Sequence, residues 1–294
     1  MKSMKTGEVL TRARNAFKMG EYPLVEKLAL RILEEQPESA TAYNLLGSVC
    51  ERTGRFRKAV EHFQKAVELA PDSPESHNNL GVVLKRMESY GEAIPHFERA
   101  LELAPGRGDV YFNLGNVYKA LDNNEAAEEN FQKAIAVDPG FVATYNNLGT
   151  VLESQGRFGD AIRVYQKGLQ ADANQPRLHY NLGIAYERLG KLDEAREEYE
   201  AALHLKPSWA DALNNLGVIR HRQGDARAAE RCLRDALRAE PRNARALNNL
   251  GVVLASTGHT DEAQHAYREA MKADPRYAQA SSNLASLLEG DLRA

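Results

Sequence analysis

Apolar residues recur with a helical spacing along the whole chain, in blocks that are 34 residues long. Within a block they fall at positions 4, 7, 8 and 11 and again at positions 20, 24, 27 and 28, the spacing of an amphipathic helix. A glycine often stands between the two sets at position 15, and a proline usually follows the second set at position 32. Both residue types interrupt helices. Each block therefore predicts two helices, A and B, and no part of the chain predicts a strand.

The repeat is most visible in its small residues. Leucine and glycine occupy positions 7 and 8 of seven successive blocks, and alanine dominates positions 20 and 27. Small side chains here predict close helix packing, because a larger one would collide with the neighbouring helix. We predict a single solenoid over 1–294, with a degenerate first repeat and a final capping helix. The degenerate repeat is 6–39, the full repeats are 40–73, 74–107, 108–141, 142–175, 176–209, 210–243 and 244–277, and the capping helix is 278–294.

These residues resemble the pattern of tetratricopeptide repeat proteins over essentially the whole chain. The resemblance implies an all-α fold, a right-handed superhelical solenoid of antiparallel helix pairs with about eight and a half repeats, in which the A helices line the concave wall. One repeat cannot bury its apolar face alone, so the stability of such a chain comes from stacking.

A narrower resemblance comes from four short stretches rich in asparagine. They are similar to the repeat region of protein O-linked N-acetylglucosamine transferases, which implies a groove that holds extended protein substrates. The catalytic domain of those enzymes has no counterpart in these 294 residues. The stretches are Asn78–Val82, Tyr145–Gly149, Asn214–Val218 and Asn248–Val252.

Helix A carries a row of asparagines that the fold does not require. A helix turns about 100° per residue, so position 6 points away from the apolar face. The asparagine amide offers one acceptor and two donors, which match the backbone of an extended peptide. We predict that the row grips the main chain of a partner; the alternative is that it bonds to an adjacent helix. The row consists of Asn79, Asn113, Asn147, Asn181, Asn215, Asn249 and Asn283.

Neighbouring positions are candidates for specificity. Position 5 holds two aromatic residues among asparagines, Phe112 and Tyr180, which either contact the partner or pack on the flank of the repeat. Position 9 supplies apolar side chains that either receive the partner or pack between neighbouring A helices, and position 13 supplies arginines that meet an acidic partner or are solvated. The position-9 residues are Val82, Ile184, Val218 and Val252, and the position-13 arginines are Arg52, Arg86, Arg188 and Arg222.

Charge and motifs exclude several functions. The net charge is −3, and the sign of the charge alternates between repeats, so no continuous phosphate track for nucleic acid is expected. No stretch approaches 18 apolar residues, so no membrane span is predicted. No histidine pair with metal-ligand spacing and no phosphate-binding glycine loop occurs, and we predict no enzyme activity, no metal and no cofactor.

The remaining candidate residues have structural explanations. His77 and His179 occupy position 4, where an aromatic residue normally packs, and are predicted to be partly buried in the core. Cys232 is predicted to replace an aromatic residue of helix B as a small packed side chain. With Cys50 far away in another repeat, no disulfide framework is expected, which favours a reducing compartment, the cytoplasm.

The sequence therefore predicts a non-catalytic protein–protein interaction scaffold that binds an extended peptide in an asparagine-lined concave groove. The alternative is the substrate-recruiting arm of a larger enzyme such as an O-GlcNAc-type glycosyltransferase, which requires the reading frame to continue beyond Ala294. A third possibility is self-association through the position-9 residues or the terminal helices. The partner itself is not specified, because repeat scaffolds share one fold across unrelated functions.

Overall fold

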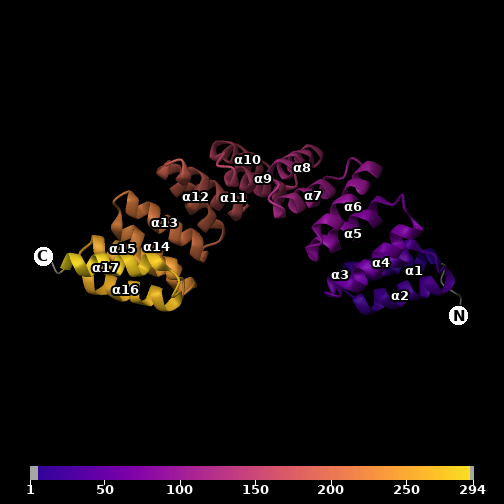
Figure 1. Cartoon of the computed structure of the whole chain (residues 1–294), viewed down its shortest axis with the longest axis horizontal. Coiled ribbons are helices and arrows are strands. Elements are labelled where there is room, and N and C mark those ends of the chain that lie inside the picture. The colour runs from indigo at the N-terminus through magenta and orange to yellow at the C-terminus, as the bar shows by residue number, and fades with distance from the viewer. Residues whose placement is uncertain (1–5, 292–294) are drawn as a thin grey trace. The chain divides into compact units, whose positions relative to one another are not determined.

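The computed structural model describes residues 6–291, and within them every element is an α-helix (Figure 1). The five-residue lead and positions 292–294 of the predicted capping helix lie outside the described residues. The all-α fold of paired helices is confirmed. The helices are α1 (Thr6–Lys18), α2 (Tyr22–Glu35), α3 (Ala40–Arg52), α4 (Phe56–Leu69), α5 (Pro74–Arg86), α6 (Tyr90–Leu103), α7 (Gly108–Ala120), α8 (Asn124–Val137), α9 (Val142–Ser154), α10 (Phe158–Ala171), α11 (Pro176–Arg188), α12 (Leu192–Leu205), α13 (Ala210–Arg222), α14 (Ala226–Ala239), α15 (Ala244–Ser256), α16 (Thr260–Ala273) and α17 (Ala278–Asp291).

The helices fall into two compact units, Met1–Thr144 and Tyr145–Ala294, and the division lies inside α9. In the first unit α1 packs on α2, α3 on α4, α5 on α6 and α7 on α8, as antiparallel pairs. In the second unit the pairs are α11 with α12, α13 with α14 and α15 with α16, and α17 packs on α16. Each unit is thus a stack of the predicted A and B helices. That all the repeats form one continuous solenoid stays a prediction.

Close approach of helix A to helix B explains the invariant glycine at position 8. A Cβ atom placed on Gly81 would lie 2.8 Å from Cε1 of Phe97, whose ring is fully buried. Equivalent aromatic rings lie against the other position-8 glycines, except in repeat 210–243, where Leu233 packs on Gly217. Leu233, not Cys232, therefore takes the place of the aromatic residue. Cys232 is half-buried beside it, and burial raises the pKa of its thiol.

A left-handed residue at position 15 ends each full-repeat A helix. Glycines take this conformation in five repeats, for example Gly54 with φ of 76°. Glu88 and Asp122 take it in the other two, with φ of 61° and 55°. A left-handed residue after the last turn of a helix is a common C-terminal cap. The break between helices A and B therefore persists even where the sequence has no glycine.

Candidate functional site

A cleft of about 510 Å³ in the unit Tyr145–Ala294 brings together predicted site residues from three A helices, α11, α13 and α15. The predicted residues that line it come from positions 5, 6, 9 and 13 of the repeat: Tyr180, Ile184, Arg188, Asn215, Val218, Arg222 and Asn249. Its other lining residues are Glu187, Asn214 and Arg245. Asn147, Asn181, Asn283 and Val252 belong to the A helices of this unit but do not line the cleft. The remaining predicted residues lie in the other unit: Arg52, Asn79, Val82, Arg86, Phe112 and Asn113.

The position-6 asparagines of this unit lie at the seams between neighbouring A helices. In four of them the amide nitrogen donates to the position-5 side chain of the preceding repeat, 35 residues earlier. The bonds are Asn181 Nδ2 to Asn146 Oδ1 at 2.8 Å, Asn215 Nδ2 to the Tyr180 hydroxyl at 3.3 Å, Asn249 Nδ2 to Asn214 Oδ1 at 2.8 Å, and Asn283 Nδ2 to Asn248 Oδ1 at 2.9 Å.

Bonds within each asparagine pair connect these seams into a relay. Asn248 Nδ2 donates to Asn249 Oδ1 at 3.4 Å, and Asn214 Nδ2 donates to Asn215 Oδ1 at 3.1 Å. Asn248 and Asn214 are buried, with 3% and 2% of their surface exposed. Hydrogen bonds among buried amides contribute more to stability than exposed ones. A buried amide without a partner would lose its hydrogen bonds to water and gain nothing in return. The row is therefore a structural element of the second unit.

Part of the row keeps hydrogen-bonding capacity for a ligand. An asparagine amide has two N–H groups, and Asn249 uses one of them on Asn214. Asn215 is 9% exposed and donates both to Tyr180 and, at 3.4 Å, to the Tyr199 hydroxyl. Of these two cleft asparagines, Asn249 retains the freer donor. The adjacent-helix alternative thus describes these contacts, and the gripping of a peptide backbone stays a prediction.

The first unit uses the same positions differently. Asn113 Oδ1 accepts a hydrogen bond from Lys85 Nζ at 2.6 Å, and burial lowers the pKa of this lysine. The side chain of Asn79 forms no hydrogen bond with any residue in 6–291. Asn78, at position 5, is 8% exposed, and its Oδ1 is buried without a hydrogen-bond partner in the described chain. The relay seen in the second unit is absent from these residues.

The two position-5 aromatic residues pack on the flanks of their own repeats. Tyr180 lies 4.5 Å from the ring centroid of Trp209, and Phe112 lies 4.7 Å from that of Phe141, edge to face. Trp209 and Phe141 both stand at position 34 of the same repeat, so an aromatic residue at position 34 accompanies each aromatic residue at position 5. This pairing is present in the sequence and could have indicated the flank contact. Tyr180 still contributes one edge to the cleft.

The position-13 arginines divide into paired and unpaired side chains. Arg222 Nη1 lies 3.3 Å from Glu187 Oε1, and Arg86 Nε lies 3.0 Å from Glu51 Oε1 in the other unit. Arg188, and Arg245 from position 2, also line the cleft but form no ion pair with any described residue. The cleft thus combines an apolar strip, amides and two guanidinium groups that are free to meet a ligand.

Both position-4 histidines are partly buried, as predicted, and they differ in their partners. His77 Nε2 lies 2.9 Å from the carbonyl of Pro71, so it donates there and its Nδ1 accepts from His96 Nδ1 at 3.1 Å. Burial, and then the charge on His77, lower the pKa of His96. His179 Nδ1 lies 2.6 Å from Glu198 Oε2, and this bond raises the pKa of His179.

Opposite pH dependence is expected for variants of these two histidines. The raised pKa of His179 stabilises the fold below the unfolded value of about 6.5, and this contribution is lost as the pH rises through the folded pKa. The lowered pKa of His96 destabilises the fold as the pH falls below about 6.5. His179→Gln should therefore destabilise more at low pH, and His96→Gln more at high pH. Urea unfolding at about pH 5.5 and about pH 8.5 measures the loss of stability in each variant. If this loss changed with pH in the same direction for both variants, the prediction would be wrong.

Within residues 6–291, no three histidine, cysteine, aspartate or glutamate side chains are grouped so that they could hold a metal ion. In the same part of the chain, no helix has the length and apolar character needed to cross a bilayer.

Comparison with known proteins points to one family. Models described as tetratricopeptide repeat, or TPR repeat, match residues 10–74, 72–140, 130–163, 150–190, 188–224 and 210–276. None of the curated proteins compared matches the chain significantly. These comparisons give no support for the narrower resemblance to O-GlcNAc transferases.

Several solved structures are similar. The crystal structure of YrrB, described as a TPR protein with an unusual peptide-binding site, is 26% identical, with a TM-score of 0.55 over 64% of this chain and 97% of that chain. A MamA crystal structure is 27% identical, with a TM-score of 0.54 over 60% and 96% of the two chains. PilF of Pseudomonas aeruginosa is 21% identical, with a TM-score of 0.62 over 72% and 97%, and shows the shared fold alone.

Proposed function

Because the chain belongs to the tetratricopeptide repeat family, we propose that it is a non-catalytic scaffold that binds an extended segment of a partner protein on its A helices. The observation that carries this proposal is the cleft of about 510 Å³ lined by α11, α13 and α15. Its lining side chains come from positions 2, 5, 6, 9, 12 and 13, whereas helix A contributes positions 4, 7, 8 and 11 to the core of each repeat. The peptide-binding site ascribed to YrrB, a similar protein, supports the same function here.

The spacing of the lining residues favours an extended ligand. Packed helices lie about 8–10 Å apart, so three successive A helices present contacts over about 16–20 Å. An extended chain advances about 3.3 Å per residue, so about six residues span that distance. A helical ligand of six residues would cover only about 9 Å. The segment therefore runs across the A helices with its side chains alternating toward and away from the cleft.

Each part of the cleft has a role in the proposed complex. Ile184 and Val218 are half-buried and receive an apolar side chain of the partner. Asn249 donates its remaining N–H to a backbone carbonyl. The side chains of Arg188 and Arg245 form no ion pair within the described residues. They favour a carboxylate group of the partner at the edge of the cleft.

The experiment is a display selection of random peptides on the full chain, followed by affinity measurement of an enriched peptide on variants. The double variant Ile184→Ser, Val218→Ser should weaken binding by about tenfold or more, because each buried apolar side chain contributes more than about 1 kcal/mol. Fluorescence anisotropy with the labelled peptide measures the loss.

Val252→Ser is the matched control, since Val252 occupies the same position in the next repeat but does not line the cleft. Circular dichroism of all variants confirms that their helix content is unchanged. Equal affinity for wild type and the double variant would place binding elsewhere and reject the cleft. Light scattering over a range of concentrations shows whether a second copy of the chain competes for the same surface.

A further inference from the structure

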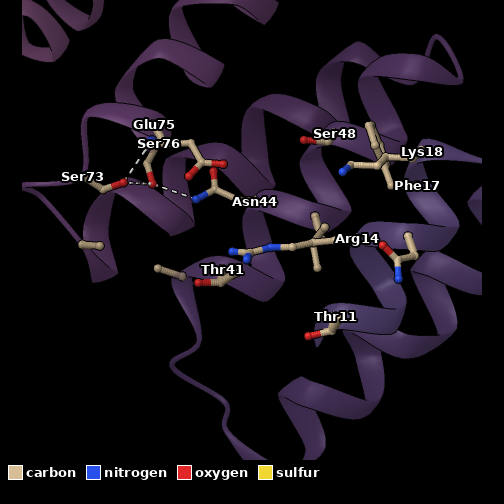
Figure 2. Close-up of a pocket in the computed structure, with 14 residues that line it drawn as sticks. Thr11, Arg14, Phe17, Lys18, Thr41, Asn44, Ser48, Ser73, Glu75 and Ser76 are labelled. Carbon is tan, nitrogen blue, oxygen red and sulfur yellow. Dashed lines mark hydrogen bonds between the residues drawn. The ribbon is translucent and has the colours of Figure 1, made fainter. Parts of the chain in front are cut away.

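A second cleft, of about 480 Å³, lies in the unit Met1–Thr144 (Figure 2). Its walls come from α1, from α3, from the first turn of α5 and from Ala70 and Ser73 between α4 and α5. None of the site residues predicted from the sequence lines it, although Asn44, Leu45 and Ser48 of α3 stand at positions 5, 6 and 9 of their repeat. Hydroxyl groups, amides and charged side chains line it together with apolar ones, those of Phe17, Ala40, Leu45 and Ala70.

Two cations stand side by side on one wall. Arg14 and Lys18 are four residues apart on α1, so they lie on the same face of that helix. Neither side chain forms a hydrogen bond or an ion pair with any residue that the structure describes. Like charges at this spacing repel each other, and an anion between them removes that repulsion. Figure 2 shows the guanidinium group of Arg14 extending toward Thr41 and Asn44.

Three uncharged polar side chains around the two cations are unused, whereas those of Thr11, Ser73 and Ser76 already form hydrogen bonds. The hydroxyls of Thr41 and Ser48 and the amide of Asn15 line the cleft and form no hydrogen bond within the described residues. The Asn44 amide is already committed, since its Nδ2 donates to Ser76 Oγ at 2.8 Å. Among the lining residues, only Glu75 carries a negative charge. A ligand that accepts hydrogen bonds and carries negative charge fits this set.

We propose that this cleft is a second peptide site, specific for an acidic segment with carboxylates on alternate residues. Side chains four apart on a helix have Cβ atoms about 5–6 Å apart. In an extended peptide, side chains on one face are about 6.6 Å apart, because they are two residues apart at about 3.3 Å each. Arg14 and Lys18 therefore match a Glu-X-Glu or Asp-X-Asp pair. Glu75, on the opposite wall, repels a further carboxylate and limits how far the acidic stretch extends.

The test uses the full chain and a fluorescein-labelled peptide, Ala-Ser-Glu-Ala-Glu-Ser-Ala, with its termini acetylated and amidated. The corresponding Gln-Ala-Gln peptide is the neutral reference. By anisotropy at low ionic strength, the acidic peptide should bind about fivefold or more tightly than the neutral one, and added salt should reduce the difference. Arg14→Glu, Lys18→Glu should abolish the preference, and Glu75→Gln should strengthen binding of the acidic peptide.

The matched control is Arg57→Glu, Lys58→Glu, which makes the same change in net charge on the exposed surface of α4, away from the cleft. If this control abolishes the preference as well, general electrostatic attraction explains the binding and the site is rejected. A phosphoserine peptide that binds when the Glu-Ala-Glu peptide does not would also overturn the proposal, in favour of a phosphate site. Ile184→Ser, Val218→Ser should leave the preference intact, so failure of this site is distinguishable from failure of the other cleft.

Discussion

Replacement of Gly81 by alanine is expected to lower the free energy of unfolding by about 1–3 kcal/mol. The new Cβ atom would lie 2.8, 2.9 and 3.0 Å from three ring carbons of Phe97. Because that ring is completely buried, it has no free space to move into, and α5 and α6 must separate. In a repeat protein, a weakened helix pair also weakens its interfaces with the neighbouring pairs. Urea denaturation of the full chain, followed by circular dichroism, measures the change.

Gly91→Ala, in α6 of the same repeat, is the matched control. A Cβ atom there meets nothing within 4 Å. Alanine favours a helix over glycine by roughly 0.5–1 kcal/mol, so this variant should be as stable as wild type or slightly more stable. If Gly81→Ala were equally harmless, the position-8 glycine would not be required for close helix packing.

Asn214→Ala is expected to destabilise the chain by about 1–3 kcal/mol, since it removes two hydrogen bonds of the buried relay. Asn214 accepts from Asn249 at 2.8 Å and donates to Asn215 at 3.1 Å, and only 2% of its surface is exposed. The truncation leaves both partners without this contact in a site that water barely reaches. Thermal and urea unfolding of the variant measure the loss.

Asn78→Ala provides the comparison, because Asn78 occupies the same repeat position in the other unit and its buried Oδ1 already lacks a partner in the described chain. Its removal also removes an unsatisfied polar group, so we expect a change within about 0.5 kcal/mol. Equal losses for Asn214→Ala and Asn78→Ala would mean that side-chain volume at position 5, and not the relay, determines stability.

The helices of this chain follow from its sequence almost to the residue. The A helices α3 to α15 begin at the first residue of the predicted repeats, because glycine, proline and apolar spacing recur with one period. Local patterns of this kind determine helices and their pairing without reference to distant residues. The left-handed conformation of Glu88 is an exception, since the sequence places there a residue that does not favour it, at the turn that ends α5.

The candidate site was predictable in its residue types but not in its contacts. A helical projection of one helix places position 6 on the outer face, yet it omits the neighbouring A helix that brings Asn249 to Asn214. The same omission concealed the packing of Tyr180 on Trp209. The second cleft escaped prediction for another reason. Arg14 and Lys18 belong to a repeat that departs from the pattern, so comparison between repeats did not indicate them as site residues.

The asparagine relay gives the second unit a chemical polarity. From Asn283 through Asn249 to Tyr180, every seam bond is donated toward the earlier repeat, so turning one amide over would break bonds on both sides of it. The amides are therefore oriented as a set, and the remaining N–H donors of the cleft point in one fixed direction. We expect a bound peptide to run in a single direction across the A helices. A spin label placed at either end of the peptide would test this, and equal relaxation effects from both ends would refute it.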